Sequence, residues 1–166
     1  MKYPFIALIF SASLAACGQQ SPNNTDNTAP IAASNGMTFA HGKGSISEDR
    51  SAAFKSFMPT FSEMRKMANG DTAFEPEKFK AAAERFTQEA RAPFDSFQND
   101  PNGNGDAMPA IWLKPVEFKS EQDKFLAAVD KLNTAAQGGK LDDIKVAFGE
   151  AANSCQSCHD SYRKPK

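Results

Sequence analysis

Two cysteines and a histidine near the end of the sequence are the residues whose types and spacing could do chemistry. Cys155 and Cys158 are three residues apart and His159 follows directly, which is a C-x-x-C-H pattern. This spacing is the attachment signature of c-type haem, in which two thiols are joined to the haem and the imidazole ligates its iron. Residues three and four apart share one side of a helix. The pattern therefore predicts one covalently attached haem c per chain, with His159 as an axial ligand.

A zinc site and a redox-active dithiol are the two alternatives for this motif. A structural zinc site needs a second pair of ligands, and the only other cysteine and histidine are Cys17 and His41. A redox dithiol opens a helix after a strand, whereas here a long helical pattern runs into the motif. Only seven residues follow His159, so the second haem face is either open or covered by a residue from upstream.

The N-terminus is typical of an export signal that ends at a cysteine. Lys2 precedes an apolar run that is too short to span a membrane and ends Leu-Ala-Ala before Cys17. That ending resembles the bacterial lipobox, so we predict residues 1–16 as a signal peptide and Cys17 as a lipidation site. The alternative is an ordinary signal peptide with an incidental cysteine. The residue after Cys17 is Gly18 rather than an aspartate, which resembles lipoproteins that are sorted to the outer membrane. This predicts a protein anchored on the periplasmic side of a Gram-negative envelope.

The mature chain is predicted to have a tether followed by one domain. Residues 17–46, the lipidated N-terminus and tether, are rich in Ser, Asn, Thr, Pro, Ala and Gly and show no helical period, which is typical of a flexible segment. His41 lies there, and we expect a solvated side chain rather than a distal haem ligand. Residues 47–166 suit a single domain.

Four helices are predicted in this domain. They extend from Ser47 as N-cap to Asn69, from about Pro76 to Phe97, from about Val116 to Gln137, and from Leu141 through the haem motif. Pro59 and Pro93 predict kinks in the first two. Strand signals are weak, so the predicted fold class is all-α, an antiparallel up-down-up-down four-helix bundle.

The haem motif continues the apolar stripe of the last helix. That stripe consists of Leu141, Ile144, Phe148, Ala151, Cys155, Cys158, His159 and Tyr162, at helical spacing. The attachment residues are thus predicted to face the core, with the haem lying inside the bundle between helices.

Three stretches resemble a known family. Residues 140–150, residues 154–163 around the haem motif, and residues 106–112 before the third helix are close to the pattern of cytochrome c′ from Gram-negative bacteria. The resemblance covers about residues 47–166, and the lipobox and tether depart from the usual soluble form. It implies a high-spin haem with His159 as the only protein axial ligand.

The resemblance also implies roles for three further residues. Phe54 matches an apolar side chain that blocks the distal face, Arg50 matches an arginine near the haem edge, and Arg163 matches a basic residue beside the proximal histidine. Their alternatives are plain core packing for Phe54 and a solvated helix face for Arg50. For Arg163 the alternative is a cation favoured by the end of a helix.

The expected function is binding of nitric oxide at an apolar distal site, with carbon monoxide as a second candidate ligand, together with one-electron redox chemistry. The alternative is a low-spin electron carrier in which Met58 supplies the second axial ligand, although such a methionine is more often core. Without an acid–base pair for peroxide cleavage we expect no enzymatic activity.

The charge and the family indicate which partners to expect. Loss of the signal peptide changes the formal charge from −1 to −2, which argues against a nucleic-acid partner. The family suggests a homodimer, and the lipid supplies the membrane contact.

Overall fold

The computed structural model describes residues 39–40 and 42–165. The predicted signal peptide, Cys17 and His41 therefore lie outside the described residues. Within the described part, no helix combines the length and the apolar character needed to cross a membrane.

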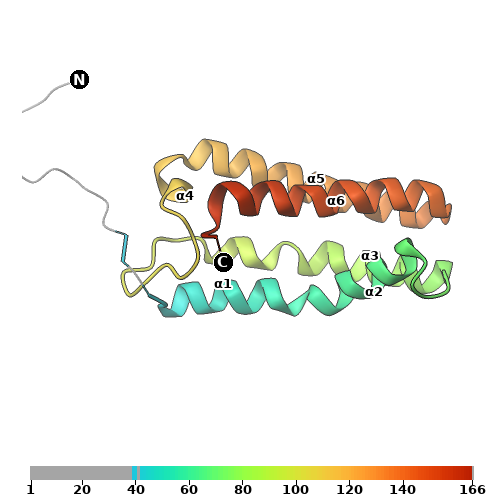
Figure 1. Ribbon diagram of the computed structural model, residues 1–166, viewed down its shortest axis with the longest axis horizontal. Helices are drawn as coiled ribbons and strands as arrows, with labels where there is room; N and C mark the ends of the chain where they lie inside the picture. The colour runs from blue at the N-terminus through green and yellow to red at the C-terminus, as the bar shows by residue number, and fades with distance from the viewer. Residues whose placement is uncertain (1–38, 41, 166) are drawn as a thin grey trace, which may run out of the picture. The chain divides into compact units, whose positions relative to one another are not determined.

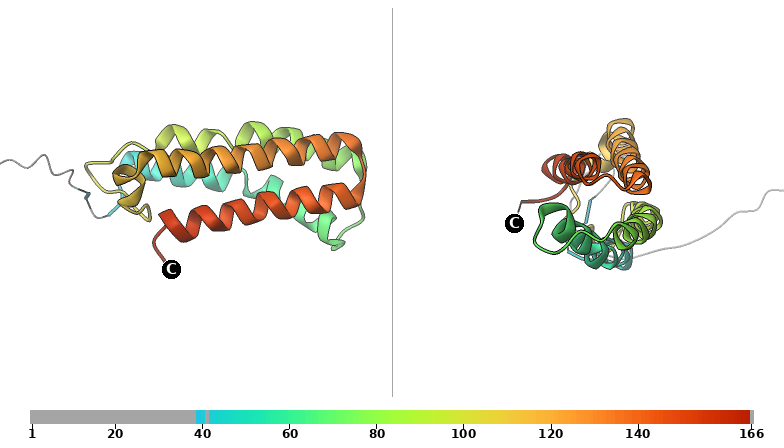
Figure 2. Two further views of the ribbon diagram at one scale, coloured as in Figure 1. Left: turned by 90° about the horizontal axis from the view of Figure 1, so that it is seen from above. Right: turned by 90° about the vertical axis from the view of Figure 1, so that its right-hand side faces the viewer.

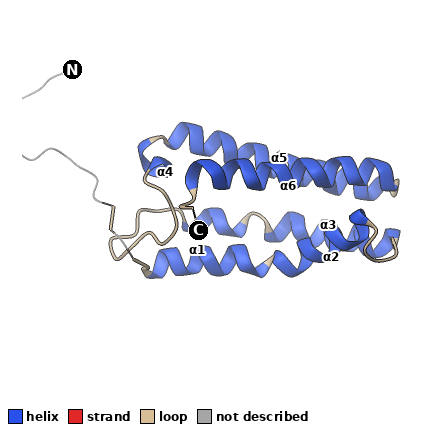
Figure 3. Cartoon of the chain, in the orientation of Figure 1, coloured by secondary structure: helices blue, strands red, loops and turns tan. Residues whose placement is uncertain are grey.

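Helices make up the ordered elements of the domain, and no strand longer than an isolated bridge occurs in the described residues (Figure 3). The elements are α1 (Ser45–Ser56), α2 (Met58–Asn69), α3 (Pro76–Glu89), the 3₁₀ helix η1 (Ala92–Ser96), α4 (Ala110–Leu113), α5 (Pro115–Gly138) and α6 (Leu141–Tyr162). The helices α1 and α2 run end to end, α3 returns beside them, α5 runs forward again and α6 returns (Figures 1 and 2). The predicted all-α, up-down-up-down bundle is confirmed.

The two proline kinks take the form of helix breaks. The first predicted helix is divided into α1, which ends at Ser56, and α2, which begins at Met58. The break occurs because Pro59 lacks an N–H and its ring clashes with the preceding turn. Likewise α3 ends at Glu89, and Pro93 lies in the first turn of η1. The predicted third and fourth helices agree with α5 and α6, and Gly139 ends α5 in a left-handed conformation at φ 68°.

The predicted N-cap of the first helix is wrong by three residues. Gly44 is the N-cap, and Ser47 lies inside the first turn, where its hydroxyl donates to the Gly44 carbonyl at 2.8 Å. The capping acceptor comes instead from the loop between η1 and α4. The buried Asp100 carboxylate accepts hydrogen bonds from the N–H groups of Ile46 and Ser47, the latter at 3.1 Å. A cap supplied from 53 residues away leaves no local sequence signal.

Asp100 is held as an anion by this arrangement. Burial of the carboxylate works to raise its pKa, but the backbone N–H groups of Asn102, Ser47 and Ile46 and the charge of Arg50 outweigh burial, so the pKa lies below its ordinary value. A Cβ on Gly44 would overlap the carboxylate. Glycine at this position therefore lets the loop approach the start of α1 closely.

Both ends of the domain are held by the same loop. Lys43 forms an isolated antiparallel bridge with Asn104, and Arg163 forms one with Ala107. The Met108 N–H also donates to the Tyr162 carbonyl at 2.9 Å. The segment that leads into α1 and the segment that leaves α6 therefore meet at one end of the bundle, next to the haem motif.

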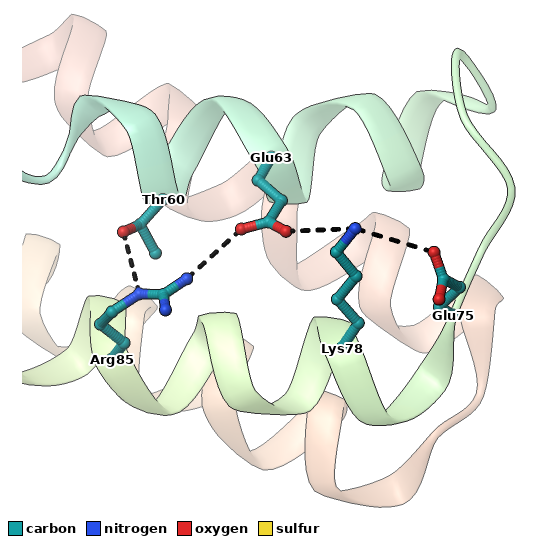
Figure 4. A network of polar contacts seen from close by, with 5 residues as sticks. All are labelled: Thr60, Glu63, Glu75, Lys78 and Arg85. Carbon is teal, nitrogen blue, oxygen red and sulfur yellow. Dashed lines mark hydrogen bonds and ion pairs between the residues drawn. The ribbon is translucent and has the colours of Figure 1, made fainter.

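A surface network joins α2 to α3 at the other end of the bundle (Figure 4). Arg85 donates to Thr60 at 3.2 Å and pairs with Glu63 at 3.3 Å, and Lys78 lies 3.5 Å from Glu63 and 3.7 Å from Glu75. Thr60 is buried, whereas the ion-paired side chains are partly or largely exposed, so each ion pair contributes little to stability.

Candidate haem site

The two thiols of the motif face the apolar interior from α6. Cys155 packs against the main core cluster of the bundle, and Cys158 packs against a second cluster made of Ala107, Ile111, Phe118 and Tyr162. Both cysteine side chains are half-buried. Burial raises the pKa of each thiol to about 11, which reflects the apolar surroundings of both sulfurs. Two cysteines on one apolar helix face fit the attachment of c-type haem.

His159 departs from the predicted core-facing stripe. The buried positions of α6 are Ile144, Ala147, Phe148, Ala151 and Tyr162. The His159 side chain is exposed instead, because at 3.6 residues per turn a residue that follows Cys158 directly lies on the flank of the stripe. The histidine is still adjacent to both thiols, so it can ligate a group that lies against this side of α6.

Arg163 lies beside the histidine. A surface pocket of about 340 Å³ is lined by Gln156, His159, Asp160, Arg163, Lys164 and Pro165. Arg163 is the first residue beyond α6, its N–H donates to the His159 carbonyl at 3.0 Å, and its guanidinium lies 3.3 Å from the Asp106 carboxylate. The structure thus brings Arg163 and His159 together at the proximal side of the predicted site.

Phe54 lies on the inner side of α1 within a ring of aromatic side chains. Its ring centroid is 5.9 Å from that of Phe57, 6.1 Å from Phe94 and 6.2 Å from Phe97, all in edge-to-face geometry. Phe54 and Cys155 pack against the same main core cluster. Nothing in the sequence pattern pointed to Phe94 and Phe97 as neighbours of Phe54, because they come from the broken end of the second predicted helix.

The helices that carry Phe54 and Cys155 are not packed on one another. Within the described residues α6 packs mainly against α5 and α2, and no comparable packing joins α6 to α1. A planar group between these helices would therefore not have to displace a helix–helix interface.

Arg50 is buried, so the solvated-face alternative for this residue is wrong. The side chain is 5% exposed, and its guanidinium donates to the carbonyls of Ser96 at 2.9 Å and Asn104 at 2.7 Å. It also lies 5.0 Å from the centre of the Phe97 ring. Burial lowers the pKa of Arg50, and the nearby Asp100 carboxylate partly offsets this. Arg50 therefore joins α1 to the ring of phenylalanines around Phe54.

Met58 lies on the outside of the bundle. Its side chain is 49% exposed and belongs to neither core cluster, whereas Met64 and Met67 are fully buried in the main core. Of the three methionines of α2, Met58 faces outward, and Met64 and Met67 face inward but are already packed in the core.

The fold and this site define a class of protein, the four-helix-bundle haem proteins with a haem attached near the C-terminus. A sequence model of the family Cytochrome C' matches residues 45–163, and the chain belongs to that family. Cytochrome c' of Rubrivivax gelatinosus is 35% identical over 126 residues, which cover 73% of this chain and 95% of the relative.

Solved structures agree with this assignment. A nitric oxide complex of a variant cytochrome c prime from Alcaligenes xylosoxidans has a TM-score of 0.69 at 32% identity and covers 73% of this chain and 94% of the other. A carbon monoxide-bound variant from the same organism has a TM-score of 0.68 at 32% identity, with 72% and 94% covered. The cofactor is a covalently attached haem c, as the motif predicts.

Proposed function

We propose that this protein binds nitric oxide and carbon monoxide at the haem face opposite His159, and that it also exchanges single electrons. The observation that carries the proposal is the set of aromatic side chains around Phe54, whose ring contacts those of Phe57, Phe94 and Phe97. Bound haem supplies an iron that takes diatomic ligands. An apolar lid offers no hydrogen-bond donor to dioxygen, which favours nitric oxide. The related Alcaligenes proteins with bound nitric oxide and carbon monoxide support this assignment.

The chain's own residues divide the work of such a site. Cys155 and Cys158 hold the cofactor, and His159 supplies the proximal nitrogen. Phe54 closes the distal side and excludes water from it. Arg163 places a cation beside the proximal histidine, 3.3 Å from its partner Asp106, where it can attract a proximal ligand or a haem propionate. The proposed Arg50 position near the haem edge is supported by its location beside Phe97.

Absorption spectra test the open site against the alternative electron carrier with Met58 as ligand. We expect high-spin ferric and ferrous spectra, a change on adding nitric oxide to the ferrous protein, and no change on Met58→Leu, because Met58 is largely outside the core. Met64→Leu provides the matched control for a buried methionine. A low-spin spectrum with a methionine-to-iron charge-transfer band that Met58→Leu abolishes would establish the alternative.

The proposal includes a periplasmic location with a lipid anchor at Cys17 in the outer membrane. Because the lipid is the only membrane attachment it includes, Cys17→Ala should move the protein from the membrane pellet to the soluble fraction. Fractionation of cells followed by haem staining measures this. A Cys17→Ala protein that stays in the pellet contradicts the anchor. The proposed assembly is a homodimer, as the family resemblance implies. The contact would be made by the first two predicted helices, which correspond to α1 with α2 and to α3.

A further inference from the structure

An exposed apolar pair lies where α4 meets α5. Leu113 and Val116 are 64% and 78% exposed, and Lys114 between them is exposed as well. The other exposed large apolar side chains of the described residues are isolated, Met58 on α2 and Val146 on α6. Water contact with two neighbouring apolar side chains costs free energy that a covering surface would recover.

The chain from the N-terminus joins the bundle beside this pair. Phe39 stacks on Trp112 with 5.4 Å between ring centroids, and Trp112 directly precedes Leu113. The Asn104 N–H donates to the Ala40 carbonyl at 3.2 Å, which holds the segment at this end. The segment that leads from the N-terminus therefore joins the bundle next to the exposed pair. An anchored N-terminus would tie this part of the bundle to the anchoring surface.

We propose that Leu113, Lys114 and Val116 rest on the lipid bilayer to which Cys17 anchors the chain. The inference rests on the proposed lipidation of Cys17. The two apolar side chains would enter the boundary between headgroups and acyl chains, and the Lys114 ammonium would meet lipid phosphate. Trp112 is half-buried and its indole N–H donates to the Phe97 carbonyl at 2.7 Å. A tryptophan with a satisfied N–H next to the contact suits a membrane interface.

The length of the tether makes so small a contact sufficient. Cys17 and Phe39 are 22 positions apart, which allows a span of up to roughly 75 Å. A chain tethered at such a distance meets its surface at an effective concentration on the order of millimolar. A contact with millimolar affinity is then about half occupied in the anchored protein, whereas the free protein would not keep it.

Hydrogen exchange of the lipidated holoprotein tests the inference on vesicles of phosphatidylethanolamine and phosphatidylglycerol. The reporters are the N–H groups of Val116 and Glu117, which belong to the first turn of α5 and have no partner within the helix. We expect their exchange to be about twofold slower on vesicles than in the Cys17→Ala protein mixed with the same vesicles, as half occupancy implies. The double variant Leu113→Ser/Val116→Ser should lose this protection. The matched control Val146→Ser, which changes another exposed valine, on α6, should keep it.

Several results would overturn the inference. Equal exchange in anchored and unanchored protein, protection that survives the double variant, or protection centred on Val146 each exclude this surface. Protection that arises only when membrane proteins are added to the vesicles assigns the surface to a protein partner instead of lipid. Mass spectrometry of the mature chain separates the causes. An unlipidated Cys17 removes the anchor and this inference together, whereas a lipidated chain without protection overturns the surface alone, and gas binding is independent of both.

Discussion

Phe54→Ala is expected to tighten carbon monoxide binding by about 30- to 150-fold. In the proposed site, a ligand on the distal face would have to displace the Phe54 ring from its contacts with Phe57, Phe94 and Phe97. Aromatic pairs are worth about 0.5–1.5 kcal/mol each. At a middle value of roughly 0.7–1 kcal/mol, leaving three of them costs about 2–3 kcal/mol, and roughly 1.4 kcal/mol corresponds to a tenfold change in affinity. The alanine variant no longer bears this cost. Titration of the ferrous protein with carbon monoxide measures the change.

Two variants separate a lid from ordinary core packing at this position. Phe54→Leu keeps an apolar side chain but loses the ring contacts, so its affinity should lie between those of wild type and Phe54→Ala. Phe74→Ala removes a half-buried ring that packs against the same core from the turn between α2 and α3. It should lower thermal stability and leave gas affinity unchanged. A Phe54→Ala protein with wild-type affinity for carbon monoxide would rule out the lid.

Arg50→Ala is expected to lower the free energy of unfolding by about 3 kcal/mol, because Arg50 makes two hydrogen bonds from a charged group and each is worth about 1.5–3 kcal/mol. The change leaves the buried carbonyl of Asn104 and the partly buried carbonyl of Ser96 without this donor. It also removes the cation that helps to hold the pKa of the Asp100 carboxylate below its ordinary value. Urea unfolding of the holoprotein, followed by helical circular dichroism, measures the effect.

Arg85→Ala is the matched control for this prediction. Arg85 also donates to two partners, Thr60 and Glu63, but its side chain is 52% exposed. Its loss should therefore change the free energy of unfolding by less than about 1 kcal/mol. Arg50→Lys keeps the charge without the forked donors and should recover only part of the loss. Equal effects of Arg50→Ala and Arg85→Ala would mean that burial of Arg50 carries no special stability.

Local patterns predicted the regular parts of the fold. Gly139 marks the end of α5 in sequence and in structure, and the periodicity of α6 placed Cys155 and Cys158 toward the apolar interior. These features depend on residues within one or two turns of each other. A single sequence is sufficient for such features because helical periodicity and chain reversal are local properties.

The parts that could not be predicted depend on distant contacts. Asp100 was recognisable as a loop residue, but nothing in its neighbourhood indicates that it caps α1. The burial of Arg50 follows from that loop closing over it, so the helical pattern by itself left a solvated face open as the alternative for this residue. The exposure of His159 was not predicted for another reason. The apolar stripe of α6 is narrower than predicted, and His159 lies on its flank. The motif predicted His159 as the ligand, and it did not indicate that the side chain is exposed.

The bridges from Lys43 to Asn104 and from Arg163 to Ala107 put the two ends of the domain on one short loop. A domain whose ends are neighbours behaves as a cassette, because it can be joined to other chains without disturbing its interior. New ends could be opened in the turn between α2 and α3 while the old ones are linked, since Gly70 marks an exposed reversal there. Addition of a leader and a tether ahead of Lys43 is one natural use of such a cassette. It would allow the same haem bundle to be placed in a different cellular location without any change in the bundle itself.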